Sequence, residues 1–166
     1  MDSDSSDDRD GSSLDIIMND TPSKAAIERA CELQGYRADW YFKGSYYDEV
    51  QVAQIETVAC HLYQVSETAK YGQAFIEQAL ASFVFDEPTA DLAYKAEEGL
   101  RGLILPDPEP DVLAHNPVAI GAACGAVADV VFPHNSERRD RNKLADALVT
   151  LCREVRGYTP IKDAEA

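Results

Sequence analysis

The clearest pattern in the sequence is a series of apolar residues whose spacing alternates between three and four positions. The series consists of Ile55, Val58, Leu62, Val65, Ala69, Gly72, Ile76, Ala79 and Phe83. It predicts an amphipathic helix over 46–83, whose start is marked by Ser45 and Asp48. Neutral residues flank the apolar face, which favours a helix inside a bundle over a free-standing coiled coil. The pattern fits one long helix or two that meet near Ser66 or Gly72.

The second strong pattern is an apolar stretch over 117–132 in which Asp129 is the only charged residue. Asn116 is a good N-cap, Pro117 suits the first helical position, and Pro133 ends the helix. A helix that is apolar on nearly all sides belongs inside a domain, so we expect it at the centre of the fold. Its length falls short of the ~20 residues that a bilayer span needs, so we expect no membrane insertion.

Two glycines inside this stretch, Gly121 and Gly125, lie four positions apart. Each costs a helix about 1 kcal/mol relative to alanine, and close approach of a second helix is the simplest compensation. We favour a helix of the same chain. The alternative is a homodimer in which Gly121 and Gly125 form the oligomer contact.

Shorter helices are expected over 22–34, 89–103 and 136–156, each with apolar residues at helical spacing and a recognisable start. Between the second of these and the central helix, residues 106–111 alternate proline with acids. Such a segment forms neither helix nor central strand, so it predicts a stiff, exposed connector.

Together these patterns predict an all-α fold, a globular bundle of five to six helices around the central helix 117–132. The helical domain is expected to occupy 21–158. Residues 1–20 are expected to be a disordered acidic tail, and 159–166 a C-terminal tail.

The acidic tail contains seven aspartates and one arginine, a net charge of −6. A short apolar patch interrupts it, formed by Leu14, Ile16, Ile17 and Met18. This composition resembles a short docking motif. The alternatives are a patch that folds back onto the domain and a patch without a role.

The net charge of the chain restricts the kinds of partner that the protein is expected to bind. The chain has 15 basic and 30 acidic residues, a net charge of −15. This balance opposes direct binding to nucleic acid and to anionic membranes, and it favours a protein partner with a basic surface. Aspartate outnumbers glutamate and arginine outnumbers lysine. An acid-rich, lysine-poor surface is typical of proteins from extreme halophiles, which is one hypothesis for the source; the other is an acidic protein from a GC-rich genome.

The four cysteines, Cys31, Cys60, Cys124 and Cys152, form no CxxC pair. A zinc site is therefore not expected, and we interpret the cysteines as reduced, buried apolar residues. The N-terminus is acidic and does not resemble a secretory leader, so we expect a cytoplasmic protein.

No arrangement of residues in the sequence indicates catalysis. No glutamate is followed by histidine three residues later, which opposes a di-iron bundle enzyme. His61, His115 and His134 are too dispersed to form a ligand set, and the acids Glu28 and Glu32 fit a solvated helix face. We therefore assign no catalytic residues, no cofactor and no metal, and lean towards a protein that is not an enzyme.

Aromatic residues concentrate over 36–47, in an ordered loop or a short extended segment. The residues that we assign to partner binding are Tyr36, Trp40, Tyr41, Tyr46 and Tyr47. Aromatic density of this kind forms either the lid of a core or a binding surface.

A basic cluster interrupts the acidic chain near its C-terminal end. It is formed by Arg138, Arg139, Arg141 and Lys143. Acids between these residues weaken a nucleic-acid interpretation. A solvated helix start is the simplest interpretation, and charge pairing with the acidic region 76–111, within or between subunits, is the more specific one.

These observations favour a non-catalytic protein-interaction or regulatory domain whose acidic surface engages a basic protein partner. One alternative is a small helical enzyme or ligand-binding protein that uses the aromatic segment 36–47. Another is a structural or viral assembly subunit.

Overall fold

The computed structural model describes residues 22–83, 85–132 and 141–156. In chain order the elements are α3 (Lys24–Gln34), α4 (Ala38–Lys43), α5 (Glu49–Ser82), α6 (Glu87–Arg101), the short 3-10 helix η1 (Val112–Ala114), α7 (Pro117–Val131) and α8 (Arg141–Arg156). The helices pack against one another and no strand occurs in the described ranges, so the predicted all-α fold is confirmed. The predicted tails and the helix start at Ser136 lie outside the described residues.

α5 is one continuous helix of 34 residues, roughly 50 Å long at the usual rise per residue. At its start, the Asp48 carboxylate accepts a hydrogen bond from Gln51 N at 2.8 Å, and Gln51 Oε1 accepts one from Asp48 N at 3.0 Å. This capping box places the start at Asp48 and not at Ser45. The helix continues through Ser66 and Gly72 without a break, so this region forms one long helix and not two.

The apolar series along α5 faces the interior, as its spacing predicts. Seven of its nine members are buried, and Val58 and Phe83 are partly buried. The buried members are Ile55, Leu62, Val65, Ala69, Gly72, Ile76 and Ala79. Periodicity therefore identifies the core side of this helix correctly.

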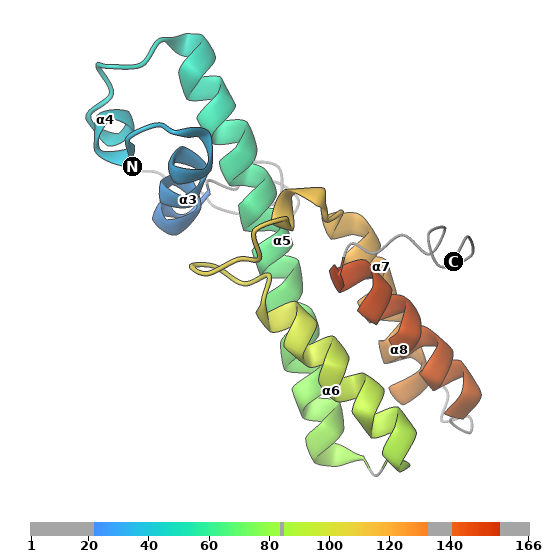
Figure 1. The fold of residues 1–166 in the computed structure, drawn as a ribbon. Coiled ribbons are helices and arrows are strands. Elements are labelled where there is room, and N and C mark those ends of the chain that lie inside the picture. Colours follow the sequence, from blue (N-terminus) through green and yellow to red (C-terminus); the bar gives the residue numbers. More distant parts are fainter. Residues whose placement is uncertain (1–21, 84, 133–140, 157–166) are drawn as a thin grey trace, which may run out of the picture.

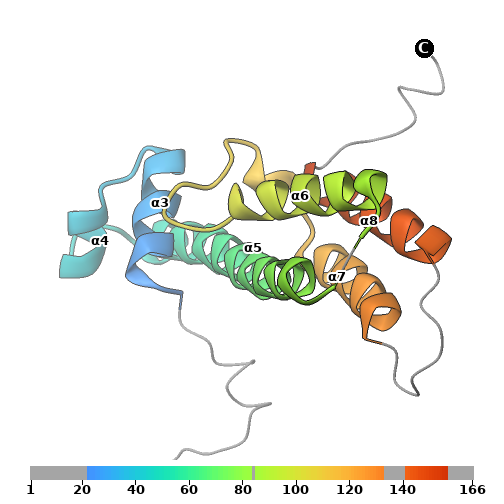
Figure 2. The same ribbon diagram turned by 90° about the horizontal axis from the view of Figure 1, so that it is seen from below.

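Figures 1 and 2 show an elongated molecule with α5 along its length. α3 packs against the N-terminal half of α5, and α4 lies beside α3 at that end. α6 runs back along the C-terminal half of α5, while α8 packs against both α6 and α7. Because α5 also contacts η1 and α7, most of the other elements pack directly on it.

α7 forms at the predicted place but is buried along one side only. The Asn116 side chain caps it by accepting hydrogen bonds from Val118 N and Ala119 N. Its inner side packs on α5 and α8, whereas Val118 is 78 % exposed and Ala122 is also exposed. The sequence predicts a helix at the centre of the fold, whereas the structure leaves one side of α7 exposed to water. Apolar residues of this kind tolerate such exposure. Neither α7 nor any other helix in the described ranges combines the length and apolar character that a bilayer crossing requires.

The aromatic segment also differs from its expected form. It contains the six-residue helix α4, bounded by Gly35 and Gly44, both at φ +79°. This left-handed backbone is readily adopted by glycine and rarely by other residues. Two glycine C-caps thus turn the chain into and out of α4.

Close helix contacts occur at glycines other than the predicted pair. A Cβ atom added at Gly72 would lie 2.5 Å from Cys124 Sγ, and one at Gly99 would lie 2.5 Å from Val155 Cγ2. At Gly121 the nearest atom would be 3.8 Å away, and at Gly125 nothing lies within 4 Å. The absence of a side chain is therefore needed at Gly72 and Gly99 for packing within the chain.

This difference predicts opposite effects of the same substitution. Gly99→Ala should lower the free energy of unfolding by about 1–2 kcal/mol, because overpacking against the stiff Val155 outweighs the gain in helix propensity. Gly125→Ala should raise it by about 0.5–1 kcal/mol, since only the propensity gain remains. Urea unfolding of the two variants measures both effects, and destabilisation by Gly125→Ala would contradict this assignment.

Candidate interaction surface

The α4 end of the molecule gathers the aromatic side chains that the sequence places close together. Trp40 stacks on Tyr46 with ring centroids 5.0 Å apart and lies 5.8 Å from Tyr47. Tyr47 in turn meets Tyr36 edge to face at 5.1 Å. The Arg37 guanidinium lies 5.1 Å from the Trp40 ring centroid, within the range of a cation–π contact.

Tyr41 and Phe42 extend this cluster towards α3. Their rings meet edge to face at 5.3 Å, and Lys24 Nζ lies 5.9 Å from the Phe42 ring centroid. We call the whole set the aromatic belt. It consists of Tyr36, Trp40, Tyr41, Phe42, Tyr46 and Tyr47. Phe42 is the one member that the sequence-based assignment of binding residues omits.

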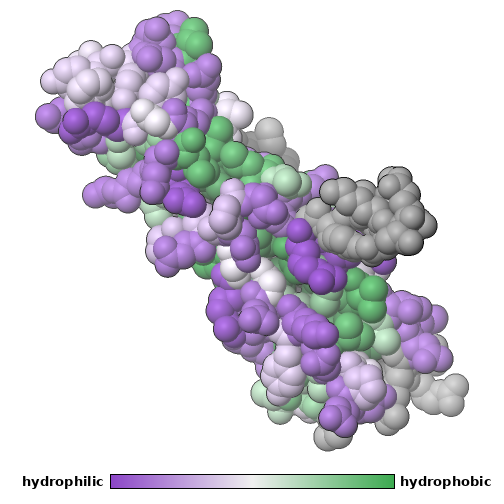
Figure 3. Space-filling view, in the orientation of Figure 1, coloured by the Kyte–Doolittle hydropathy of each residue, from purple (hydrophilic) through white to green (hydrophobic). Residues whose placement is uncertain are grey.

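Three rings of the belt are exposed to water, and the other three pack against the core and support them. Trp40, Phe42 and Tyr46 are 36 %, 47 % and 55 % exposed. The other members, Tyr36, Tyr41 and Tyr47, are partly buried against the core. In Figure 3 this end is a pale area of intermediate hydropathy. The two interpretations of the segment, core lid and binding surface, thus apply to different rings.

Hydroxyl groups of the supporting rings hold the belt in place. Tyr36 Oη donates to Gln54 Oε1 at 2.6 Å, and Tyr47 Oη accepts from Arg37 N at 2.7 Å. Tyr41 Oη donates to Glu56 Oε2 at 2.6 Å. Burial and this bond to a carboxylate both disfavour the tyrosinate and raise the pKa of Tyr41 to about 12. Two of these bonds reach α5, so the belt is anchored to that helix.

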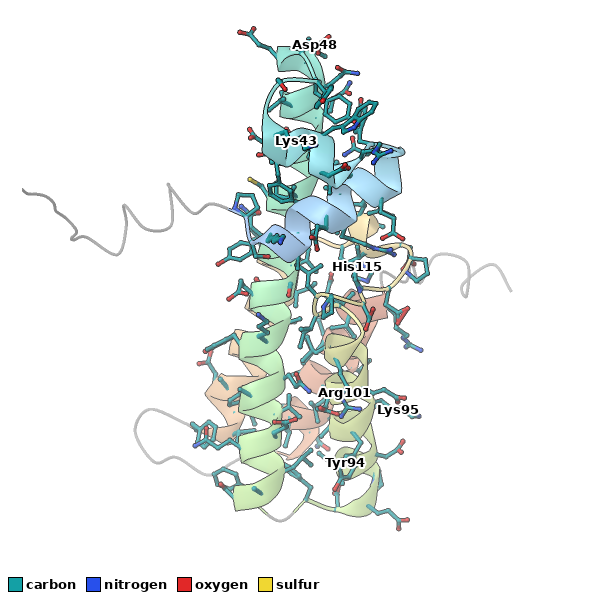
Figure 4. The ribbon with its side chains drawn as sticks, turned by 90° about the vertical axis from the view of Figure 1, so that its left-hand side faces the viewer. Lys43, Asp48, Tyr94, Lys95, Arg101 and His115 are labelled. Carbon is teal, nitrogen blue, oxygen red and sulfur yellow. The ribbon has the colours of Figure 1, made fainter. Side chains whose placement is uncertain are left out.

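An open groove lies beside the belt, between α3, α4 and α5. Its volume is about 1120 Å³. Its wall includes Lys24 and Ile27 of α3, Tyr41 and Phe42 of α4, and Cys60 of α5. Lys43, at the end of α4, lies at the same end of the molecule as Asp48 (Figure 4). The groove combines apolar surface with charged groups, as ligand and peptide sites do.

The cysteines are all free, and three of them are buried. Burial raises the pKa of Cys31 and Cys152, and that of Cys124 to about 11. These thiols are therefore poor nucleophiles, in line with the structural role expected for them. Cys60 differs because it is only half-buried and lines the groove.

The histidines occupy separate places. His115 is buried, and its Nε2 lies 2.7 Å from Val155 O, which ties the segment before α7 to the end of α8. His61 lies on α5, and His134 is outside the described residues. No group of three or more histidine, cysteine or acidic side chains within 22–83, 85–132 and 141–156 is arranged to hold a metal ion.

A buried carboxylate, Glu97, lies between α5 and α6. Its side chain accepts from Arg101 Nη2 at 2.7 Å and from Gln73 Nε2 at 2.8 Å. Burial alone raises the pKa of Glu97, but the two hydrogen bonds and the Arg101 charge outweigh it, so the pKa is lowered. Its partners lie within the bundle, so we interpret Glu97 as a structural link between α5 and α6.

The remaining predicted site residues are not brought together. Gly121 and Gly125 lie on α7 and are partly exposed. Of the basic cluster, Arg138 and Arg139 lie outside the described residues, as does the side chain of Arg141. Lys143 is exposed on α8. Charge pairing with region 76–111 therefore stays a prediction.

The chain matches no known family model, no curated protein and no solved structure. The site must therefore be interpreted from its own geometry.

The Glu97 contacts predict a pH-dependent contribution to stability. Glu97→Gln should lower the free energy of unfolding by about 1–3 kcal/mol near neutral pH, because a charge-assisted hydrogen bond is lost. The pKa of Glu97 is lower in the folded chain than in the unfolded one, so its contribution is complete above the unfolded value of about 4.3. It disappears as the pH falls through the lowered folded value. Urea unfolding across this pH range measures the gap between the two proteins, and a constant gap would contradict the prediction.

Proposed function

We propose that this chain is a non-catalytic protein-interaction domain that contacts a basic protein through the aromatic belt. The observation that supports this most directly is the exposure of Trp40, Phe42 and Tyr46 at one end of the molecule while their neighbours hold them in place. Large aromatic side chains that face water in a fixed arrangement are the usual centres of protein interfaces.

Fixed geometry strengthens the proposal. A flexible aromatic side chain loses rotational freedom when it binds, which weakens association. Trp40 stacks on Tyr46 and contacts the Arg37 guanidinium, and the nearby Tyr36 and Tyr47 rings are held by hydrogen bonds. Most of this ordering cost is therefore already met in the folded chain. Arginine and aromatic residues are also the types most often found at interface hot spots.

The charge of the partner follows from the surface of α6 and the connector after it. Exposed acids follow one another there, and we call them the acidic face: Glu87, Asp91, Glu98, Asp107, Glu109 and Asp111. Tyr94 is 61 % exposed on the same helix, beside Lys95 (Figure 4). Figure 3 shows a mostly hydrophilic surface over α6. Such a surface attracts a basic partner and repels an acidic one.

A second candidate is a small-ligand-binding protein, which the groove beside Tyr41 and Phe42 favours. Thermal stabilisation by a small molecule, lost on substitution of Tyr41, would distinguish this function from a protein interface. The assembly-subunit alternative depends on the exposed side of α7, and light scattering at several protein concentrations tests it.

The proposed function is tested by affinity capture with the full chain as bait, from the cells that make it. We expect a basic protein that is released by high salt. Trp40→Ala combined with Tyr46→Ala should weaken its binding about tenfold or more, as truncation of an aromatic hot spot does. The control is Tyr71→Ala, which removes a ring that is 63 % exposed on a distant part of α5.

Captured proteins that are acidic would contradict the charge part of the proposal. Equal binding by the wild type and the double variant would contradict the role of the belt. Equal loss in the Tyr71→Ala control would show that the effect is not specific to the belt.

A further inference from the structure

We propose that the apolar patch Leu14, Ile16, Ile17 and Met18 docks in the groove between α3, α4 and α5 of its own chain. The occupant is thus a segment that precedes the described residues. The apolar character of the groove, its two lysines and the length of the connecting chain each support this choice.

The groove offers apolar surface of the kind that this patch needs. Ile27 lies in its wall, with the Phe42 ring, 47 % exposed, and the partly buried Tyr41 ring beside it. Aliphatic side chains that leave water for an exposed aromatic surface gain free energy. In the described helices the groove is open, so its surface is free to receive a segment.

The groove also offers two lysines to the acids of the segment. Lys24 and Lys43 line the groove, and neither forms an ion pair within the described part of the chain. Three acids, Glu28, Asp39 and Glu56, line the groove as well. Asp39 pairs with Arg37 at 3.0 Å and Glu56 accepts the Tyr41 hydroxyl. The net charge of −6 in the first 20 residues complements the two lysines.

The connecting chain is short and starts at the right place. Pro22, where the described chain begins, itself lines the groove. Met18 is separated from it by three residues, so it lies at most roughly 14 Å away at ~3.5 Å per residue. A segment tethered this closely has an effective concentration in the millimolar range, so even weak contacts fill the groove.

Docking would cover Phe42 and the α3 side of the aromatic belt. The segment would then compete with a partner for part of the same surface and set how strongly the partner binds. Docking itself involves only this chain, so it is tested without a partner and independently of the proposed interaction.

The half-buried Cys60 reports on the groove. In the full chain we compare its rate of alkylation by N-ethylmaleimide in the wild type, in Ile17→Asp and in a matched control, Ser12→Asp, with mass spectrometry to identify each thiol. Cys124 is buried, and its pKa of about 11 makes it slow to react, so its rate reports any general opening of the fold.

Release of the patch should increase the Cys60 rate in Ile17→Asp about tenfold, the ratio expected if docking contributes about 1.4 kcal/mol. Ser12→Asp should leave the rate near that of the wild type, because it adds the same charge outside the patch. Lys43→Gln should increase the rate less than Ile17→Asp does. Equal Cys60 rates in the wild type and Ile17→Asp would overturn the proposal. So would protection of Cys60 that rises with protein concentration, since the patch would then occupy a second copy.

Discussion

The fold depends on how closely three helices approach one another at Gly72. Gly72 lies on the inner side of α5, and a Cβ atom there would be 2.5 Å from Cys124 Sγ of α7 and 3.0 Å from Leu100 Cδ1 of α6. Both neighbours are buried, Leu100 fully and Cys124 to all but 1 %. The missing side chain thus lets α6 and α7 pack on the same turn of α5, and α8 closes the bundle against both.

This junction also determines where the candidate surfaces lie. With α6, α7 and α8 gathered around the C-terminal half of α5, the N-terminal half is left for α3 and α4. α4 buries no residue of its own and is held by ring contacts and by the hydrogen bond from Tyr41 to Glu56 of α5. The belt therefore lies outside the main core, where local contacts hold its exposed rings in place.

Much of the fold is predictable from local sequence signals. The spacing along α5 identifies its buried side, and Asn116 with Pro117 gives the start of α7. These features depend on residues a few positions apart, so the sequence contains them directly. The position of α7 in the bundle depends on which helices meet it, and composition does not specify that. The same limit explains the glycines: Gly121 and Gly125 match a known spacing, whereas Gly72 and Gly99 are identified only by what lies opposite them.

The candidate surface is predictable to a similar extent. Aromatic density indicates the right segment, but the division into exposed and supporting rings requires α5, which supplies Gln54 and Glu56 as hydrogen-bond acceptors. The groove is not visible in the sequence, because its walls come from three separate helices. Its half-buried thiol, Cys60, is the cysteine for which the expectation of burial is least accurate.

A double-mutant cycle at the junction tests the close approach of α5 and α7 most directly. Gly72→Ala should destabilise the fold by about 1–3 kcal/mol through overpacking, and Cys124→Ala by about 1 kcal/mol through a small cavity. In the combined variant the added methyl group should occupy the space left by the sulfur. The combined variant should therefore be destabilised by less than the sum of the two single variants, with a difference of at least about 1 kcal/mol. Strictly additive losses in urea unfolding would show that Gly72 and Cys124 do not meet, and would contradict the packing described for α5 and α7.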